Sequence, residues 1–445
     1  MGRKMSVLLP VLLLALALEA RGQEIRFNVL QYRLDNGLTV LALEDHSLPS
    51  VSYYTFFRVG SRNERPGRTG ISHLFEHMMF NGAKKYGPGA FDRQLEARGG
   101  FSNAFTAEDA TVYYEAFPKE ALELVIDMEA DRMAGLQISE ESLASEREVV
   151  KEERRLRVDN DVQGAMAELL QATAYLAHPY RWPIVGWMAD LDAITVADCQ
   201  DYFRTHYAPN NATIVLVGDF DPKRAIELLS TAFGPIPAQP QAAPVVRSEP
   251  PQRGERRAVL KKAAQLPAVA VAYHVPGTDS TDLFALDLLE VLLGDGDSSR
   301  LVRSLVYERG LASRVSVDDE WRLDPSTFVL FAEARPGVAL ETLEAALLSE
   351  VEGLGRGEVE AAELRKAKNV RTVSLVKSLK THSGKAEEIG RFEVLFRGYA
   401  KLFDVVSRYE AVTTAQIREV AARYLHPDNR TVVTLVPTPE EATSP

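Results

Sequence analysis

The chain has 445 residues, of which 46% are hydrophobic and 26% are charged, and its formal net charge is −12. This length exceeds what one typical core accommodates, so we expect two domains of ordinary globular composition. The acidic balance offers no basic surface for phosphate, which argues against a nucleic-acid-binding protein.

The N-terminal segment, residues 1–22, is predicted to be a signal peptide. It begins with the basic residues Arg3 and Lys4 and continues with an apolar run from Val7 to Leu18. That run is shorter than the roughly 20 residues that a membrane-spanning helix needs, although an uncleaved anchor is the alternative. We therefore expect export of the chain to a periplasmic or secreted location.

The stretch ISHLFEHMMFNG, residues 71–82, places two histidines and a glutamate within five positions. On a helix, His73 and His77 lie one turn apart and Glu76 shares their side, while apolar residues at i, i+3, i+4 and i+7 would bury the helix. Two neutral imidazoles at this spacing can bind one zinc ion, with the carboxylate close to the water on the metal. The alternative is a chance match on a charged helix, so a third protein ligand is required.

Two further segments downstream bear on this question. Residues 99–117, GGFSNAFTAEDATVYYEAF, are typical of two strands joined by a turn. The segment SEREVVKEERR is typical of a helix on which Glu146 and Glu153 lie seven residues apart and therefore on one face. The other charged residues of that helix are interpreted as a solvated surface.

One unit of sequence occurs twice. Residues 193–220 and 411–438 align without a gap at an offset of 218, and each copy predicts a helix, a proline turn and a β-branched strand. A period of this length indicates a duplicated domain rather than a solenoid. Strand-like runs alternate with long amphipathic segments in both halves, which favours an α+β fold with helices over largely antiparallel sheets.

A proline-rich stretch separates the copies and is predicted to be a semi-rigid linker. The expected organisation is a signal peptide, an N-terminal domain, a linker and a C-terminal domain, over residues 1–22, 23–235, 236–255 and 256–445 respectively.

The H-x-x-E-H pattern is the inverted zincin motif, and the chain resembles the pitrilysin/insulinase-type zinc peptidases. Within them it is similar to the two-domain branch related to the β subunit of the mitochondrial processing peptidase and its bacterial relatives. The likeness extends over the motif helix, residues 99–117, the EREVVKEE segment, the duplicated domain and GDGDSSRL. In that family the third zinc ligand is a glutamate 76 residues after the second histidine, a position that Glu153 occupies here.

The resemblance implies a zinc metalloendopeptidase with one Zn²⁺ per chain. His73, His77 and Glu153 would bind the metal, and Glu76 would act as general base on the attacking water. Glu146 would hydrogen-bond a ligand histidine and fix its tautomer, with a plain surface carboxylate as the alternative.

The resemblance also implies how a peptide binds. The strand that contains Asn103, Ala104 and Phe105 would be a sheet edge beside the zinc, to which the peptide adds as a further strand. Main-chain hydrogen bonds would then hold short or unfolded peptides with little demand on their sequence.

The C-terminal domain lacks the motif, because Leu286, Leu289 and Glu290 stand where His73, Glu76 and His77 would be. Active relatives also carry an arginine and a tyrosine, seven residues apart, that hold the substrate opposite the zinc. Here those positions are Val306 and Ser313, and the nearby Arg309 and Arg314 are out of register.

An enclosed clam-shell chamber needs about four such domains, of which this chain supplies two. We therefore expect a heterodimer, favoured over a homodimer, in which a homologous subunit supplies the missing arginine and tyrosine. The alternative function is a non-catalytic, zinc-binding subunit of the same family that captures peptides or acts structurally.

Overall fold

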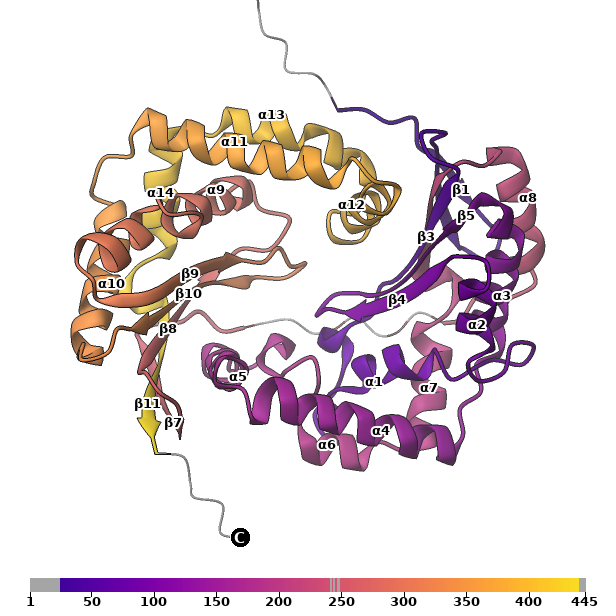
Figure 1. Cartoon of the computed structure of the whole chain (residues 1–445), viewed down its shortest axis with the longest axis horizontal. Coiled ribbons are helices and arrows are strands. Elements are labelled where there is room, and N and C mark those ends of the chain that lie inside the picture. Colours follow the sequence, from indigo (N-terminus) through magenta and orange to yellow (C-terminus); the bar gives the residue numbers. More distant parts are fainter. Residues whose placement is uncertain (1–24, 241, 243–244, 246–248, 440–445) are drawn as a thin grey trace, which may run out of the picture.

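The computed structural model describes residues 25–439 except 241, 243–244 and 246–248. This part of the chain forms two lobes, each consisting of one β-sheet with helices packed against it (Figure 1). The predicted α+β class, with two duplicated and largely antiparallel sheets, is confirmed. The expected signal peptide, residues 1–22, lies outside the described residues.

The first lobe contains a six-stranded sheet in the order β1-β2-β6-β3-β5-β4, in which β2 and β6 pair in parallel and the other neighbours are antiparallel. Its strands are β1 (Leu30–Arg33), β2 (Thr39–Glu44), β3 (Ser50–Phe57), β4 (Phe101–Thr106), β5 (Thr111–Pro118) and β6 (Ala212–Gly218). The α-helices of this half are α1 (Ile71–Met78), α2 (Ala90–Glu96), α3 (Leu122–Gly135), α4 (Glu140–Arg154), α5 (Val162–Ala174), α6 (Met188–Ala193), α7 (Val196–His206) and α8 (Pro222–Phe233). Its short 3-10 and π segments are η1 (Ser61–Asn63), η2 (Lys119–Ala121), η3 (Arg155–Asp159), η4 (Pro179–Arg181) and η5 (Pro209–Asn211).

The second lobe repeats this plan with a five-stranded sheet in the order β7-β11-β8-β10-β9, in which β7 and β11 are the parallel pair. Its strands are β7 (Arg256–Ala263), β8 (Ala268–Val275), β9 (Ala312–Asp319), β10 (Ser326–Ala334) and β11 (Arg430–Thr438). Its α-helices are α9 (Leu283–Gly294), α10 (Leu340–Leu354), α11 (Ala361–Ser378), α12 (His382–Leu395), α13 (Val405–Ala411) and α14 (Thr414–Tyr424). The short segments are η6 (Val302–Glu308), η7 (Tyr399–Asp404) and η8 (Pro427–Asn429).

The residues shared by the two sequence copies make the same hydrogen bonds in both lobes. Thr195 and Thr413 each cap the helix that follows, because their hydroxyls accept the backbone N–H three residues later at 3.2 Å. Asn211 and Asn429 each donate a side-chain N–H to the carbonyl five residues earlier at 2.8 Å, which ties the proline turn to the preceding helix. The residues that recur in the two sequence copies therefore make the same local hydrogen bonds in both lobes.

Each lobe contributes one helix that packs on the sheet of the other lobe. Helix α5 packs on β7, β8 and β11 of the second sheet, and its counterpart α12 packs on β3 and β6 of the first sheet (Figure 1). Met166 and Leu170 of α5 are buried against the second sheet, while Ile389 and Phe392 of α12 are buried in the core that contains residues of the first sheet. Packing across the lobes thus does not follow the order of the chain.

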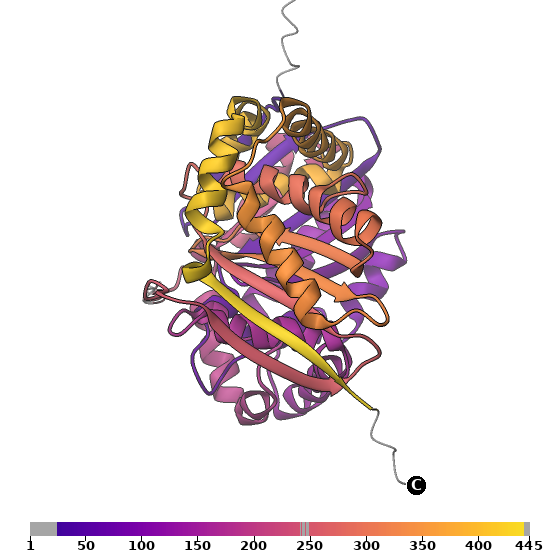
Figure 2. The same cartoon turned by 90° about the vertical axis from the view of Figure 1, so that its left-hand side faces the viewer.

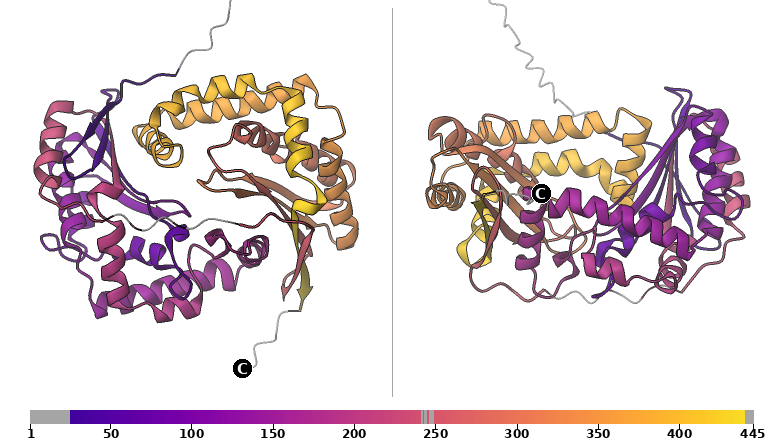
Figure 3. Two further views of the ribbon diagram at one scale, coloured as in Figure 1. Left: turned by 180° about the vertical axis from the view of Figure 1, so that it is seen from behind. Right: turned by 60° about the horizontal axis from the view of Figure 1, so that its bottom comes forward.

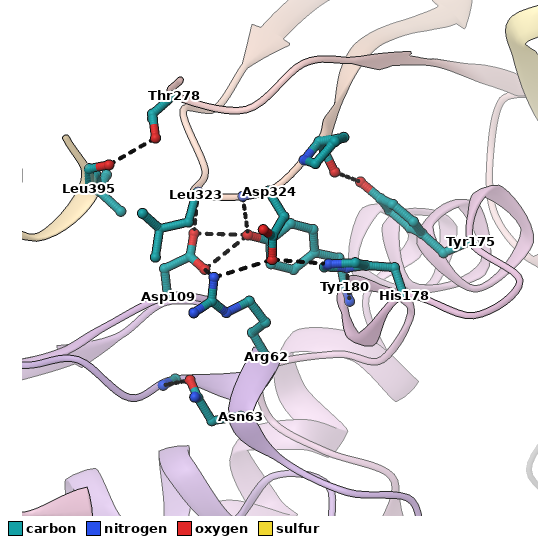
Figure 4. A network of polar contacts seen from close by, with 12 residues as sticks. Arg62, Asn63, Asp109, Tyr175, His178, Tyr180, Thr278, Leu323, Asp324 and Leu395 are labelled. Carbon is teal, nitrogen blue, oxygen red and sulfur yellow. Dashed lines mark hydrogen bonds and ion pairs between the residues drawn. The ribbon is translucent and has the colours of Figure 1, made fainter. Parts of the chain in front are cut away.

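Polar contacts join the lobes at a second place (Figure 4). The Arg62 guanidinium lies 3.1 Å from Asp109 and 3.2 Å from Asp324, which belongs to the loop between β9 and β10. The Tyr180 hydroxyl donates to Asp109 at 2.9 Å, and His178 Nε2 lies 3.2 Å from Asp324. This network holds the β9–β10 loop of the second lobe against the first.

The remaining helices form the outer layers. Helix α10 lies over the outward face of the second sheet (Figure 2), where it contacts β8 and β10. Helices α3 and α8 contact one another on the outer side of the first sheet, and the two sheets lie at opposite ends of the molecule (Figure 3). Among the described residues, none of the helices has the length and apolar character needed to cross a bilayer.

The expected linker, residues 236–255, lies between α8 and β7, and its described residues form neither helix nor strand. Its boundaries, and those of the domains 23–235 and 256–445, stay predictions.

The contact of α12 with the first sheet gives a test of the exchanged packing. A Cβ atom at Gly390 would lie 2.0 Å from Cε2 of Phe56, a side chain that is only 3% exposed. We expect Gly390→Ala to lower the free energy of unfolding by about 1–3 kcal/mol, because this overpacking outweighs the gain of about 1 kcal/mol in helix propensity. Denaturant unfolding measures the difference.

The matched control is Gly353→Ala in α10, where nothing lies within 4 Å of the added Cβ and slight stabilisation is expected. Combining Phe56→Leu with Gly390→Ala should restore part of the loss. If Gly390→Ala proved as stable as the parent chain, α12 would not dock on β3 as described.

Candidate metal centre

The start of α1 is held in place by a buried carboxylate. Glu64 accepts the backbone N–H groups of Gly70 and Ser72, both at 2.8 Å, and so satisfies two of the free donors at the helix N-terminus. Burial raises the pKa of Glu64, whereas the two N–H donors oppose this rise. Gly70 has a φ of 85° and a Cβ there would lie 2.6 Å from the Val185 carbonyl, so only glycine fits.

The apolar side of α1 is buried as its sequence predicts. Ile71, Leu74, Phe75 and Met78 lie in the core of the first lobe and are at most 4% exposed. This burial fixes the rotation of the helix, and it leaves His73, Glu76 and His77 on the side that faces α4 and a cavity.

The third residue comes from the last turn of α4, which packs against α1. Glu153 Oε2 lies 3.5 Å from His73 Nε2 and 3.3 Å from His77 Nε2. One potential ligand atom from each of the three side chains lies within 4.8 Å of the other two. The structure therefore brings together the three residues that the sequence proposes as metal ligands, although 76 positions separate the glutamate from the second histidine.

The predicted general base lies beside them. Glu76 Oε2 accepts a hydrogen bond from the Thr106 hydroxyl at 2.7 Å, and Thr106 is the last residue of β4. Burial raises the pKa of Glu76, ahead of the Thr106 hydrogen bond and the charge of His77, which lower it. The Thr106 hydroxyl therefore holds one carboxylate oxygen of Glu76, and the other oxygen can accept a proton.

Two further charged residues orient the cluster. Glu146 Oε2 lies 3.5 Å from Nδ1 of His77, the ring nitrogen that does not face Glu153. Glu146 is the residue for which the resemblance implies a role in fixing the tautomer. Arg157 Nε contacts the second oxygen of Glu153, Oε1, at 3.0 Å. His77 Nδ1 and Glu153 Oε1 therefore each contact a charged neighbour, and Oε2 is the oxygen of Glu153 that faces the histidines.

The donor set fits a zinc ion. Two imidazole nitrogens and one carboxylate oxygen are typical ligands of catalytic zinc sites. Burial lowers the pKa of His73 to about 4, so its ring is neutral and has a lone pair to donate. The two Nε2 atoms converge on one carboxylate oxygen, and a cation between them would contact all three groups.

A cavity of about 1300 Å³ opens in front of the cluster. His73, Glu76, His77 and Glu153 line it, and so do the predicted substrate residues Asn103, Ala104 and Phe105 of β4. Strand β4 is the edge of the first sheet, as predicted. Asn103 and Phe105 are exposed there whereas Ala104 is buried, which is the alternation of an edge strand with one solvated face.

The second lobe supplies the opposite wall of this cavity. Neither Val306 nor Ser313 is among its lining residues, and the Ser313 hydroxyl donates instead to Glu333 Oε1 at 2.7 Å. Arg314 does line the cavity, with its guanidinium carbon 5.0 Å from the centre of the Phe331 ring. From the sequence, Arg314 is identified only as an arginine near, but not at, the arginine position of active relatives.

Sequence reasoning missed three residues that shape the centre. Arg157 lies four residues after Glu153, a spacing from which a helical ion pair can be read. Thr106 directly follows the predicted substrate residues on β4, but its contact with Glu76 depends on the tertiary packing. Glu64 gives no signal in the sequence, because it lies in a loop and caps the helix through its side chain.

Known proteins resemble this chain over most of its length. The model of the insulinase family, peptidase family M16, matches residues 39–186, and the model of the peptidase M16 inactive domain matches residues 193–371. The zinc protease PqqE of Helicobacter pylori is 32% identical over 91% of this chain and 92% of its own length. A probable mitochondrial-processing peptidase subunit beta of Arabidopsis thaliana is 25% identical over 88% of this chain and 75% of its own.

Solved structures show the same fold. The crystal structure of a protease from Helicobacter pylori superimposes with a TM-score of 0.89 at 32% identity, covering 92% of this chain and all of the other. The periplasmic protease PqqL from Escherichia coli gives a TM-score of 0.75 at 18% identity and is matched over 48% of its chain. The resemblance inferred from the sequence is confirmed, and the chain belongs to peptidase family M16, the insulinase family.

Proposed function

We propose that the chain is a zinc-dependent endopeptidase that hydrolyses short or unfolded peptides. The observation that carries the proposal is that His73, His77 and Glu153 converge next to Glu76. Thr106 holds only one of the two carboxylate oxygens of Glu76. Relatives with the same architecture are named zinc proteases, which supports a peptidase activity.

His73, His77 and Glu153 would hold the metal, with one zinc ion per chain. A zinc ion there acts as a Lewis acid, which acidifies water and polarises the peptide carbonyl. Glu76 accepts the proton of the attacking water and returns it to the leaving amine, while Thr106 keeps the carboxylate oriented. Glu146 and Arg157 prevent rotation of His77 and Glu153 away from the metal.

The exposed edge of β4 positions the substrate. A peptide added beside Asn103 and Phe105 places its backbone next to Thr106 and hence next to Glu76. The cavity of about 1300 Å³ is larger than the usual small-molecule pocket of about 300–1000 Å³, and it accommodates an extended segment but not a folded domain.

Substitution of Glu76 separates metal binding from proton transfer. The Glu76→Gln variant should retain zinc but lose at least about 100-fold in kcat, since general-base catalysis contributes roughly 10²–10⁴-fold. His73→Ala and Glu153→Ala should lose the metal itself. Metal analysis of the purified proteins and cleavage of an internally quenched peptide, with and without chelator, give the two readouts.

The control is Glu410→Gln, an exposed glutamate on α13 that lines neither the metal centre nor its cavity. Substantial turnover by Glu76→Gln would remove Glu76 from the base role. Peptide binding without any cleavage by the parent chain would instead favour the alternative of a peptide-capturing subunit.

We also propose that the chain is exported and works with a homologous partner. A relative carries the name of a β subunit, and the fold of this chain matches about half of PqqL. Ser313, at the tyrosine position of active relatives, is engaged with Glu333 and does not face the metal cavity. The missing substrate anchors therefore come from a second subunit that has the arginine and tyrosine but lacks the zinc motif.

Mixing the purified chain with such a homologous subunit should raise kcat/KM for the quenched peptide at least about 10-fold, as expected for the loss and recovery of one charged hydrogen bond to substrate. Size-exclusion chromatography of the mixture should show a 1:1 complex. Full activity of the isolated chain, unchanged by the partner, would contradict the heterodimer but not the peptidase.

A further inference from the structure

A second cavity lies between the lobes, beside the second lobe's counterpart of the metal centre. Glu290 on α9 stands at the sequence position of His77, and Arg371 on α11 lies 218 residues after Glu153, which is the offset between the two copies. In the structure Arg371 Nη2 contacts Glu290 Oε2 at 2.6 Å. An ion pair has therefore replaced the histidine and glutamate, and a cavity of about 510 Å³ adjoins it.

The lining of this cavity is strongly acidic. Nine carboxylate side chains and three arginines face it. Each arginine already contacts a carboxylate: Arg371 contacts Asp287 and Glu290, Arg322 contacts Glu108 and Glu320, and Arg391 contacts Glu388. The carboxylates outnumber the lining arginines threefold, and Arg62 from outside the lining pairs with Asp109. Burial raises the pKa of several of the others, including Glu290 and Asp287, so a cation that entered the cavity would favour their charged form.

One of these carboxylates is buried with an oxygen that no described residue hydrogen-bonds. Asp319, the last residue of β9, is 7% exposed, and its Oδ2 receives no hydrogen bond from the described residues. Burial raises its pKa well above the usual range, and the nearby carboxylates of Asp287, Glu290 and Asp318 raise it further, against the opposing charge of Arg371. A buried carboxyl group left unpaired is costly unless something else satisfies it.

We propose that this acidic cavity binds the basic side chain, lysine or arginine, of a peptide substrate. Asp319 receives the cationic head, and the aromatic walls, which include Phe56 and Trp321, contact the aliphatic stem or the guanidinium plane. A metal ion is the poorer guest, because among the described residues only His73, His77 and Glu153 bring three ligand atoms within 4.8 Å of one another.

The cavity is reached directly from the metal centre. It shares Phe105, Glu108, Asp318 and Arg322 with the cavity in front of the metal residues. Phe105 precedes Thr106 at the end of β4, where Glu76 is bound, and Ala107 and Glu108 continue into the acidic cavity. A peptide lying along β4 therefore places a residue only a few positions from the scissile bond in front of Asp319. This inference rests on the proposed function for the placement of the peptide.

The test compares arginine with citrulline, which has nearly the same shape but no charge. Acetylated and amidated peptides, with a single arginine or citrulline moved through the sequence, are titrated against the full-length zinc-loaded Glu76→Gln chain by fluorescence anisotropy. At the favoured position we expect arginine to bind on the order of 10-fold more tightly, as for a charge-assisted hydrogen bond to a buried carboxylate. Blocked termini ensure that the side chain is the only cation compared.

Asp319→Asn in the same background should reduce the arginine-to-citrulline ratio at least threefold. Because it removes an unpaired buried acid, this variant should unfold at the same or a higher temperature. Asp318→Asn, at the junction of the two cavities, serves as a second variant, and Asp279→Asn, an exposed aspartate that lines neither cavity, should keep the parent ratio.

A ratio near one at every position, or a ratio that Asp319→Asn leaves unchanged, overturns the proposal and makes the cavity a relic of the duplication. The binding assay requires no hydrolysis. Failure of the parent chain to cleave peptides would therefore count against the proposed function while the arginine preference still stood.

Discussion

The packing of α1 against α4 is the constraint on which the candidate centre depends. The loop at Val185 and Gly186 is held between them. A Cβ at Gly186 would lie 2.4 Å from the Thr69 carbonyl just before α1, and the Gly186 carbonyl accepts a hydrogen bond from Arg154 of α4 at 2.8 Å. This close approach, which only glycine allows, sets the distance between two helices far apart in sequence. Glu153 precedes Arg154 directly, so the same contact that anchors Arg154 fixes the carboxylate opposite the histidines.

The sequence predicts this centre better than it predicts the packing of the chain. The spacing of His73 and His77 on a buried helix is a local property, and the resemblance added Glu153. The exchange of α5 and α12 between the lobes was not predictable, because an apolar stripe shows which face of a helix is buried but not against which sheet. Contacts between loop side chains and distant elements, such as Glu64 with α1, leave no periodic signal at all.

The two lobes share one arrangement of strands and helices but carry different side chains at corresponding positions. Both place an edge strand next to the counterpart helices, with Thr106 ending β4 and Asp319 ending β9. In the first lobe His77 and Glu153 face each other, whereas in the second Glu290 and Arg371 neutralise one another. The ion pair removes any site for a cation between those two residues, yet it leaves Asp319 unpaired. The match of the second half to an inactive domain thus reflects loss of the metal ligands and not loss of the cavity.

The exchanged helices also determine how a peptide reaches both cavities. Opening a hinge between the lobes would expose Met166 and Leu170 of α5 together with Ile389 of α12, all of which are at most 1% exposed. Each large apolar side chain contributes about 1.5–3 kcal/mol on burial, so this motion would cost more than about 4 kcal/mol before the contacts of Arg62 with Asp109 and Asp324 are broken. Movement within one chain is therefore too costly to admit substrate routinely. For the proposed function, the exposed edge of β4 is therefore the approach that needs no separation of the lobes.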